Sequence, residues 1–523
     1  MTTAQTGPSP KAAKGKAGAL HRDLGLLDAT MLVMGAMIGS GIFITSAESA
    51  RLVGAPGWLL VAWALAGLMT VSGALASAEL AAMMPRAGGQ YVFLRFAYGP
   101  MFGFLFGWSM FLVVQTGTIA AVAVAFAKFL GVFLPSVAAD VYLVRPLVLG
   151  HYALCLSTQQ IVALVLIAVL TLTNTRGLRL GALIQNSFTF AKTAALIGLI
   201  AVGLTLGISG KAAAWTSSWW NSPANGWSSA SAYKDGQLPV EGPTALVFLV
   251  GLAMIGPLFS QSAWNNVTFT GGETRDPART LPRALFLGTT SVVVLYLLAN
   301  LAYLVSLPFD QIQNAPQDRV GTAAMEAALG PGARYVMAAA ILVSTFGCVN
   351  GLVLAGARVY YAMARDGLFF KSVGTTNSHH VPAVALVAQG LWAALLTLPV
   401  TVSTNPATQV VSYGNVYSDL LEYIIPVDVT FYTLMVGAVI ALRVKAPGLN
   451  RPYRTVGYPV PALIYIGLAV FLVVDFIYLR TKTSGIGFLI LLTGIPVYLV
   501  WHHRSAPRNS SPQSGPELTT QES

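Results

Sequence analysis

The residues of this sequence that are best placed to bind a small molecule offer backbone groups rather than catalytic side chains. The stretch MGAMIGSGIF, residues 34–43, lies in an apolar segment yet contains Gly35, Gly39, Ser40 and Gly41. Glycine costs about 1 kcal/mol relative to alanine in a helix interior, so the stretch predicts a helix that is interrupted at its middle. Backbone N–H and C=O groups freed in hydrocarbon carry a further cost. They therefore need a partner that replaces the lost helical hydrogen bonds.

A second interruption is predicted in the segment PTALVFLVGLAMIGPLFSQSAWNNVTFT, residues 243–270. Gly256 and Pro257 stand at its middle, and small polar residues follow at 260–262. Proline lacks an amide donor and breaks the helical hydrogen-bond ladder. Two interrupted segments could present unpaired backbone groups to one shared ligand.

Lys192, in NSFTFAKTAAL, is a charged side chain placed deep in an apolar segment. It lies about ten residues into the segment 182–208, which is roughly 15 Å at a rise of about 1.5 Å per residue. An ammonium group at that depth costs on the order of 3 kcal/mol unless it is paired or solvated. A purely structural lysine could extend to the membrane surface, but the depth favours a buried partner.

Side chains typical of enzymes and metal sites are scarce. Cys155 and Cys348 are the two cysteines, too few for a disulfide framework or a thiolate metal site, and the six histidines lie at or outside the ends of the apolar segments. The sequence contains no H-E-x-x-H, G-x-S-x-G or phosphate-binding G-x-x-x-x-G-K-[ST] motif. We therefore predict no enzyme activity, no cofactor and no metal site.

The composition is that of a polytopic membrane protein. The chain has 523 residues, of which 55% are hydrophobic and 9% are charged, whereas soluble domains are about 25% charged. Crossing a bilayer takes roughly 20 apolar residues. Twelve apolar stretches are read as spans: 26–48, 57–83, 101–134, 159–175, 182–208, 243–270, 284–306, 334–364, 381–400, 416–443, 459–479 and 484–502.

The basic residues are distributed unevenly between the two sides of these spans. If the N-terminus is cytoplasmic, 20 of the 30 Lys and Arg residues lie on the cytoplasmic side and 8 on the other. This asymmetry agrees with the positive-inside rule and predicts that both termini are cytoplasmic. The net charge of +11 is therefore explained by topology, and we predict no nucleic-acid partner.

The positions of the two interruptions predict the architecture. They fall five spans apart, as expected for an inverted repeat of five plus five helices. We expect an all-α membrane protein of twelve transmembrane helices, with helices 1 and 6 unwound at mid-membrane. The expected parts are a disordered cytoplasmic tail at 1–22, the first half of the repeat at 23–208, an extracellular loop at 209–241, the second half at 242–443, spans 11 and 12 at 444–503, and a disordered cytoplasmic tail at 504–523.

Several motifs within residues 22–503 resemble those of the amino acid–polyamine–organocation (APC) transporters, and within them the L-type amino acid transporter branch. These motifs are IGSGIF, SAELAAMMPRAGGQYVFLRFAYGP, FAKTAALIGLI, LFSQSAWNNVTFTGGETRDPARTLPRAL, ARVYYAMARDGLFF and LNRPYRTVGYPVPAL. The resemblance implies a secondary transporter that moves amino acids across the plasma membrane by alternating access. We expect a prokaryotic member of this branch.

The resemblance also implies that the two interruptions bind one amino acid. Amides at 39–41 would face its carboxylate, because unpaired N–H groups at a helix N-terminus form an anion site. Freed carbonyls near Ile38 and at 259–261 would hold its ammonium group, and Phe259 would cover it. Gln261 stands where this branch commonly has an aromatic residue, which leaves the identity of the substrate open. The implied substrate-binding residues are Ile38, Gly39, Ser40, Gly41, Phe259, Ser260, Gln261, Ser262, Trp264 and Asn265.

The same resemblance implies a role for Lys192. In relatives that use sodium, a bound ion links span 1 to span 8, whereas this branch has a lysine at that place. Lys192 would replace the ion by bridging the carbonyl of Gly35 or Ala36 to Ser344 and Thr345 in span 8, which implies sodium-independent exchange. The alternatives are an amino acid sensor that does not transport, a proton-coupled amino acid or polyamine symporter, and an ion channel.

The expected partners are the amino acid and the lipid bilayer. Animal members of this branch attach to a heavy chain through a cysteine in the loop between spans 3 and 4. Cys155 lies close to the start of span 4 rather than in mid-loop. We therefore expect that the chain does not require a heavy chain.

Two further features lead to structural expectations. Glu79, near the end of span 2, is expected to pair with Arg86 or Arg95. The loop 209–241 is rich in tryptophan, and it either anchors at the membrane interface or packs over the outer vestibule. Its tryptophans are Trp215, Trp219, Trp220 and Trp227.

Overall fold

The computed structural model describes seven stretches of the chain. They are residues 24–85, 88–176, 178–209, 218–233, 243–379, 381–404 and 411–505. The predicted tail at 1–22 lies outside them. Of the tail predicted at 504–523, residues 504 and 505 are described, and they form the end of a helix.

The described residues are mostly helical. In chain order the elements are α1 (Leu26–Met37), α2 (Gly41–Val53), α3 (Pro56–Met83), α4 (Gly89–Tyr98), α5 (Pro100–Ser109), the π-helix η1 (Met110–Val114), α6 (Gln115–Leu130), β1 (Tyr142–Leu149), β2 (Tyr152–Ser157), α7 (Thr158–Thr175), α8 (Leu178–Ser209), η3 (Ser222–Asn225), α9 (Ser229–Ala232), α10 (Pro243–Ala253), α11 (Ile255–Ser260), η4 (Trp264–Glu273), α12 (Pro277–Ser306), α13 (Phe309–Gln313), η5 (Pro316–Asp318), α14 (Val320–Leu329), α15 (Ala333–Arg365), η6 (Lys371–Gly374), α16 (Ala383–Leu396), β3 (Pro399–Thr404), β4 (Val411–Tyr413), α17 (Val416–Lys445), α18 (Val460–Leu479) and α19 (Thr481–Ser505).

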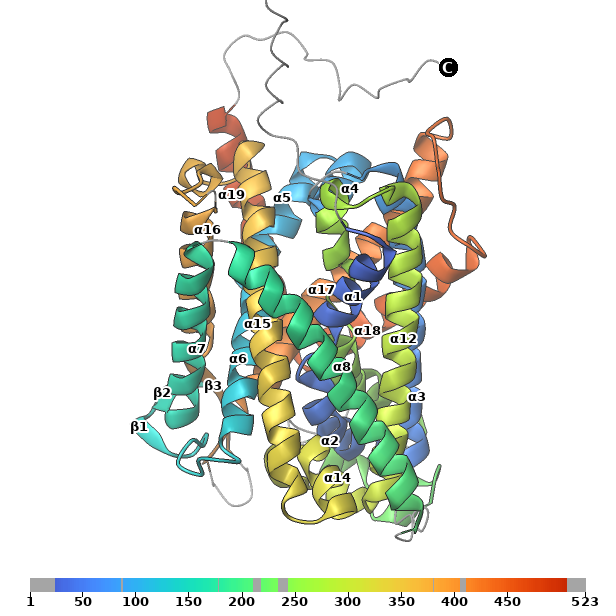
Figure 1. Ribbon diagram of the computed structural model, residues 1–523, viewed down its shortest axis with the longest axis vertical. Helices are drawn as coiled ribbons and strands as arrows, with labels where there is room; N and C mark the ends of the chain where they lie inside the picture. The colour runs from blue at the N-terminus through green and yellow to red at the C-terminus, as the bar shows by residue number, and fades with distance from the viewer. Residues whose placement is uncertain are drawn as a thin grey trace, which may run out of the picture.

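The long helices form a bundle (Figure 1). Within the described stretches, ten helical segments are long and apolar enough to cross a membrane, and eleven if α1 and α2, which are bent by 44°, count as one span. The segment predicted to span at 381–400 is not among these span-length helices, because its helix α16 has 14 residues. A mostly helical membrane protein is thus confirmed, with fewer span-length helices than the twelve predicted.

A four-stranded antiparallel sheet departs from the predicted all-α fold. Its strand order is β1-β2-β3-β4, and Tyr152 of β2 pairs with Thr401 of β3. Strand β3 takes the last residues of the stretch read as a span at 381–400. Pro399 cannot continue the helix, and the Val–Thr alternation that follows it favours a strand.

The two ends of the bundle can be told apart by their short elements. We call the end that carries α4 the α4 end, and the opposite end, with α14 and β1, the α14 end (Figure 1). The pair α1–α2 runs from the α4 end toward the α14 end. Helix α12 packs against α1, α3 and α8, while α15 packs against α6 and α8. These contacts surround the interruption between α1 and α2 with long helices.

The described part of the tryptophan-rich loop packs on the turn between α2 and α3. Trp227 Nε1 donates a hydrogen bond to Leu52 O at 3.1 Å, and Trp58 Nε1 donates to Trp220 O at 3.0 Å. Trp215 lies outside the described residues. The loop therefore supplies partners for carbonyls at the end of α2, which would otherwise be unpaired.

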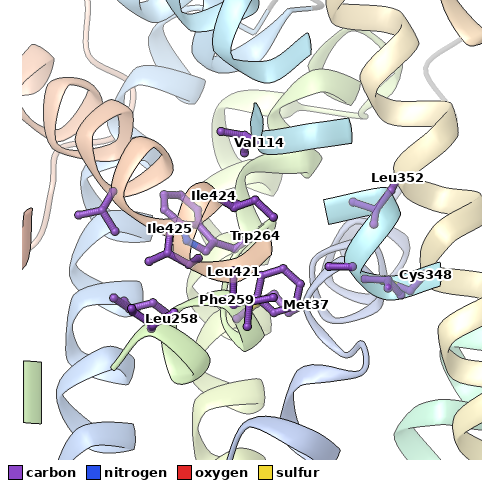
Figure 2. Close-up of a cluster of buried hydrophobic side chains, with 14 of the residues drawn as sticks. Met37, Val114, Leu258, Phe259, Trp264, Cys348, Leu352, Leu421, Ile424 and Ile425 are labelled. Carbon is purple, nitrogen blue, oxygen red and sulfur yellow. The ribbon is translucent and has the colours of Figure 1, made fainter. Parts of the chain in front are cut away.

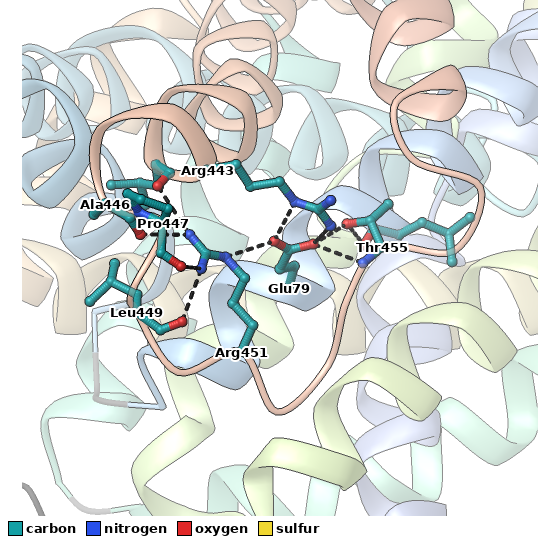
Figure 3. Close-up of polar contacts among 9 residues, drawn as sticks. Glu79, Arg443, Ala446, Pro447, Leu449, Arg451 and Thr455 are labelled. Atoms are coloured by element: carbon teal, nitrogen blue, oxygen red, sulfur yellow. Dashed lines mark hydrogen bonds and ion pairs between the residues drawn. The ribbon is translucent and has the colours of Figure 1, made fainter.

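At the α4 end, Glu79 ties α3 to α17 and to the segment before α18 (Figure 3). Glu79 is 1% exposed and accepts hydrogen bonds from Arg443 at 3.0 and 2.6 Å. The Thr455 amide and hydroxyl each donate to it at 2.8 Å, and Arg451 Nε lies 3.5 Å from its carboxylate. The buried carboxylate thus has charged and neutral donors around it, as burial of a charge requires.

Of the two partners predicted for Glu79, Arg95 is wrong and Arg86 is untested. Arg95 pairs with Asp366 instead, and Arg86 lies outside the described residues. The prediction chose arginines near Glu79 in the sequence, whereas the end of α17 reaches it through helix packing.

Candidate functional site

The first predicted interruption lies between α1 and α2. Helix α1 ends at Met37, Ile38 has extended backbone angles (φ −72°, ψ 96°), and α2 begins at Gly41. Ile38 and Ser40 are both 0% exposed. Backbone groups freed here are inside the bundle, where each needs a partner.

The second interruption lies on both sides of Gly256 and Pro257 rather than at them. Helix α10 ends at Ala253, and both residues belong to the six-residue helix α11. The chain then leaves the helical path at Gln261 and at Ala263, whose φ of 64° is left-handed, before the 3-10 helix η4. Pro257 is in the first turn of α11, where N–H groups have no intrahelical partner, so its missing amide breaks no hydrogen bond.

The two interruptions meet where the start of α2 contacts α11. A Cβ atom on Gly41 would lie 2.8 Å from Ser260 Cβ, and one on Gly256 would lie 2.9 Å from Thr45 Oγ1. Thr45 Oγ1 and Ser260 Oγ are 3.4 Å apart. Glycine is required at both positions because any side chain would overlap the facing helix.

Two tyrosine hydroxyls of α12 reach the first interruption, and the sequence analysis did not predict these contacts. Tyr296 donates to Met37 O at 2.9 Å, and Tyr303 donates to Ile42 O at 3.2 Å. A tyrosine in an apolar span needs a partner for its hydroxyl, and the run VVVLYLLANLAY, residues 292–303, carries that signal. The protein itself thus binds two carbonyls that flank the break, so a ligand is not their only possible partner.

Lys192 of α8 is buried against α1. Its side chain is 1% exposed, and Nζ donates to Gly35 O, one of the two acceptors predicted. Cys348 of α15 lies at the other end of the same interruption. The Cys348 Sγ would lie 3.3 Å from a Cβ on Gly39, so Lys192 and Cys348 both adjoin the first interruption.

The partners predicted for Lys192 on α15 are wrong. Thr345 Oγ1 donates to Ile341 O of its own helix at 2.8 Å, a common alternative for a hydroxyl inside a helix. Ser344 Oγ is buried without a hydrogen-bond partner in the described chain. Cys348, which adjoins Gly39, follows Ser344 by four residues and shares its helix face.

Phe259 forms an apolar wall beside the first interruption. It is 6% exposed, and its ring meets that of Tyr417 edge to face, with centroids 5.9 Å apart. The Tyr417 hydroxyl lies 3.2 Å from Ser40 Oγ. Figure 2 draws Met37 and Leu421 in the same buried hydrophobic cluster as Phe259.

Trp264 and Asn265 make their polar and ring contacts with α4 and α17. The Trp264 ring stacks on Tyr432 with centroids 5.0 Å apart. Asn265 Nδ2 donates to Gln90 Oε1 at 2.7 Å, and Asn265 Oδ1 accepts from Tyr432 at 3.1 Å. Both polar atoms of the Asn265 side chain are therefore engaged within the protein.

Gln261 and Ser262 occupy the turn after α11. Gln261 Nε2 donates to Trp63 O at 3.4 Å, whereas its Oε1 is buried without a partner in the described chain. Ser262 donates through its amide and its hydroxyl to Phe259 O, at 3.2 and 2.9 Å. One carbonyl predicted to bind a substrate ammonium is therefore already engaged.

Two cavities flank α11. The first extends toward the α14 end, and the second lies next to the turn after α11. Residues of the first include Thr45, Glu48, Gly256, Tyr417, Glu422 and Arg480, and those of the second include Gln261, Ser262, Trp264, Asp428, Tyr432 and Tyr465. In the stretches that the structure describes, no cluster of His, Cys, Asp and Glu side chains could hold a metal ion.

The sequence of these elements matches a known family. A family model described as amino acid permease covers residues 24–501, which include both interruptions and Lys192. The chain belongs to the amino acid permease family. The resemblance to APC transporters is thereby confirmed, and the fold of this permease agrees with that assignment.

Curated relatives share most of the length of this permease. It is 29% identical over 511 residues to the large neutral amino acids transporter small subunit 2 of Mus musculus, covering 95% of the permease and 85% of that protein. It is 27% identical over 503 residues to the Asc-type amino acid transporter 1 of Mus musculus, covering 94% and 83%. It is 27% identical over 444 residues to the b(0,+)-type amino acid transporter 1 of Oryctolagus cuniculus, covering 84% and 80%. These relatives belong to the L-type branch predicted, but they are mammalian and give the expected prokaryotic origin no support.

Proposed function

We propose that this permease is a secondary transporter that exchanges amino acids by alternating access. The observation that carries this proposal is the contact between the two interrupted segments, where Gly41 at the start of α2 meets Ser260 at the end of α11. Helix ends that meet inside a bundle can offer N–H groups to a carboxylate and C=O groups to an ammonium group. The names of the three relatives, which describe amino acid transporters, support an amino acid as the ligand.

The proposed site assigns a role to each interrupted segment. Amides at 39–41 bind the carboxylate, where the α2 dipole places its positive end. Carbonyls near Ile38 and Ser260 bind the ammonium group, and the Phe259 ring covers the substrate. The contact between α2 and α11 opens to admit it, as a gating step requires. The remaining proposed contacts are Gln261, Ser262, Trp264 and Asn265.

We further propose a topology of twelve spans for this transporter. In it the short helix α16 is the ninth span, the first and second sets of five spans form an inverted repeat, and α18 and α19 lie outside the repeat. The support is that the interruptions fall in the first and sixth spans. The excess of Lys and Arg on one side, 20 against 8, favours cytoplasmic termini, and the multi-pass chain is placed in the plasma membrane.

Lys192 supports independence from sodium. Its Nζ donates to Gly35 O, beside the break in the first span. An ammonium group fixed there would repel a second cation. In this proposal Lys192 takes the place of a bound ion and holds α8 to α1.

The environment of Cys155 supports activity without a heavy chain. Cys155 lies in β2, is 6% exposed, and its Sγ is 3.6 Å from Gln160 Oε1. Burial raises the pKa of the Cys155 thiol. Disulfide formation needs an accessible thiolate, so Cys155 is poorly placed to link to another chain.

Exchange can be measured with the full chain reconstituted in liposomes. We expect radiolabelled L-leucine or L-lysine to enter liposomes that are preloaded with unlabelled amino acid, and to enter empty liposomes far more slowly. Binding without uptake would instead identify a sensor. Rapid uptake into empty liposomes under an inward proton gradient would identify a proton-coupled symporter, and either result would contradict the exchange proposal.

A further inference from the structure

The second cavity contains a charged group that the exchange mechanism has not used. The cavity lies between α3, the turn after α11, α17 and α18, and the rings of Trp264, Tyr432 and Tyr465 form part of its wall. Asp428 of α17 is the single charged residue among the described residues that line it. Asp428 is 6% exposed. An ionisable group buried inside a membrane span is costly and is commonly functional.

Two acceptors in this cavity have no donor. In the described part of the chain, no residue donates a hydrogen bond to Asp428 or forms an ion pair with it. Gln261 is 1% exposed, and because its Nε2 donates to Trp63 O, its Oε1 is the end that is left without a partner. Buried acceptors without donors are unfavourable. A ligand that brings hydrogen-bond donors into the cavity would therefore stabilise both groups.

We propose that this cavity receives the side chain of the transported amino acid, and that this side chain is basic, ending in an ammonium or guanidinium group. The inference rests on the proposed exchange function and names its substrate class. Gln261 and Ser262, which line the cavity, directly follow Ser260 in the chain, so the cavity adjoins the place where the substrate backbone is expected to bind. A basic side chain brings only donors and a positive charge, which is what a carboxylate and an amide oxygen need.

The aromatic wall fits the same occupant. A cation over the face of a Trp or Tyr ring is attracted by the ring quadrupole, and three such rings line the cavity. A neutral apolar side chain would leave Asp428 without a counter-charge and would gain no hydrogen bond from Gln261. Sites built to hydrogen-bond a substrate group discriminate strongly against analogues that lack it.

L-lysine and L-norleucine test the inference on the unmodified protein, because norleucine keeps the lysine chain up to the last carbon and lacks the ammonium nitrogen. Each would compete against labelled substrate in exchange by proteoliposomes. We expect L-lysine to compete at a concentration lower by about tenfold or more. Equal competition, or better competition by norleucine, would overturn the inference while exchange itself stands. Absence of exchange with every amino acid would overturn the proposed function instead.

Substitutions then assign the preference to the cavity. Asp428→Asn should lower the lysine-to-norleucine preference by about tenfold, and Gln261→Met should lower it by a smaller factor. Asp475→Asn is the matched control, because Asp475 is also a buried carboxylate without a hydrogen-bond partner among the described residues, but it lies on α18 outside the cavity wall. We expect this control to keep the preference. A preference unchanged in both Asp428→Asn and Gln261→Met would overturn the inference, and if one variant does not fold, the other decides.

Discussion

At the scale of single residues, substitution of Lys192 tests whether its hydrogen bond between α8 and α1 is needed for exchange. Lys192→Ala removes the donor to Gly35 O and leaves a buried carbonyl unpaired, at a cost of about 1–3 kcal/mol. A change of about 1.4 kcal/mol shifts a balanced inward–outward equilibrium about tenfold. We therefore expect the initial exchange rate in proteoliposomes to fall by about tenfold.

Two further variants complete the Lys192 experiment. Lys192→Arg should not restore exchange, because a planar guanidinium does not replace a compact ammonium group. Lys371→Ala changes an exposed lysine in η6 and should leave the exchange rate as it is. Full activity in Lys192→Ala would show that the Lys192 ammonium is not needed.

Cys155 gives a second prediction at the residue scale. Because burial raises the pKa of its thiol, the reactive thiolate is scarce at neutral pH, and we expect maleimide to label Cys155 slowly in the folded protein and rapidly after denaturation. Labelling of the folded protein should speed up as the pH rises toward the raised pKa. Cys155→Ala should keep exchange in the chain purified alone; a folded Cys155→Ala protein without exchange would contradict activity without a heavy chain.

At the scale of elements, the contact between α2 and α11 explains why glycine is needed at position 41. Gly41→Val would place a β-branched side chain against Ser260, where a Cβ alone would already lie 2.8 Å from the Ser260 Cβ. We expect substrate binding to be lost, as measured by scintillation proximity or calorimetry. Gly467→Val is the control, because a Cβ on Gly467 of α18 would meet no atom within 4 Å. Normal affinity in Gly41→Val would remove the site from the α1–α2 break.

The Glu79 cluster predicts a loss of stability at the element scale. Glu79→Gln leaves Arg443 and Arg451 without their buried carboxylate, and breaking a buried ion pair costs roughly 3–5 kcal/mol. We expect a clearly lower melting temperature in detergent. Glu326→Gln breaks the exposed pair with Arg334, whose side chains are 38% and 42% exposed, and should change stability by about 1 kcal/mol or less. Similar melting temperatures for the two variants would contradict a stabilising role for Glu79.

At the scale of the whole molecule, the question is which gradients the transporter uses. A buried ammonium group at the place proposed for an ion predicts that replacing sodium by choline on both sides of the membrane leaves the initial exchange rate unchanged. The measurement is uptake of labelled amino acid into preloaded proteoliposomes in the two salts. A strong dependence on sodium would contradict the role given to Lys192.

The sequence by itself determined the features that depend on local composition. The break at Gly39–Gly41 could be predicted because glycine disfavours a helix wherever it stands. Most spans could be predicted because the bilayer thickness fixes the length of an apolar helix. The end of the helix within 381–400 was not predicted, because hydropathy does not distinguish the last turn of a helix from an apolar strand that follows it. Strand β3 begins at Pro399, three residues after α16 ends.

Only the tertiary structure decided which groups meet. Tyr296 binds Met37 O across 259 residues of sequence, and Arg443 binds Glu79 across 364. Such pairs depend on how helices far apart in the chain pack together, and a short stretch of sequence does not predict that packing. Cys348 of α15 lies beside Gly39 at the first break, whereas Ser344, one turn earlier on the same helix face, was expected there. The residues of the first break could therefore be predicted from the sequence, whereas their partners were determined by the packing of α8, α12 and α15 around the break.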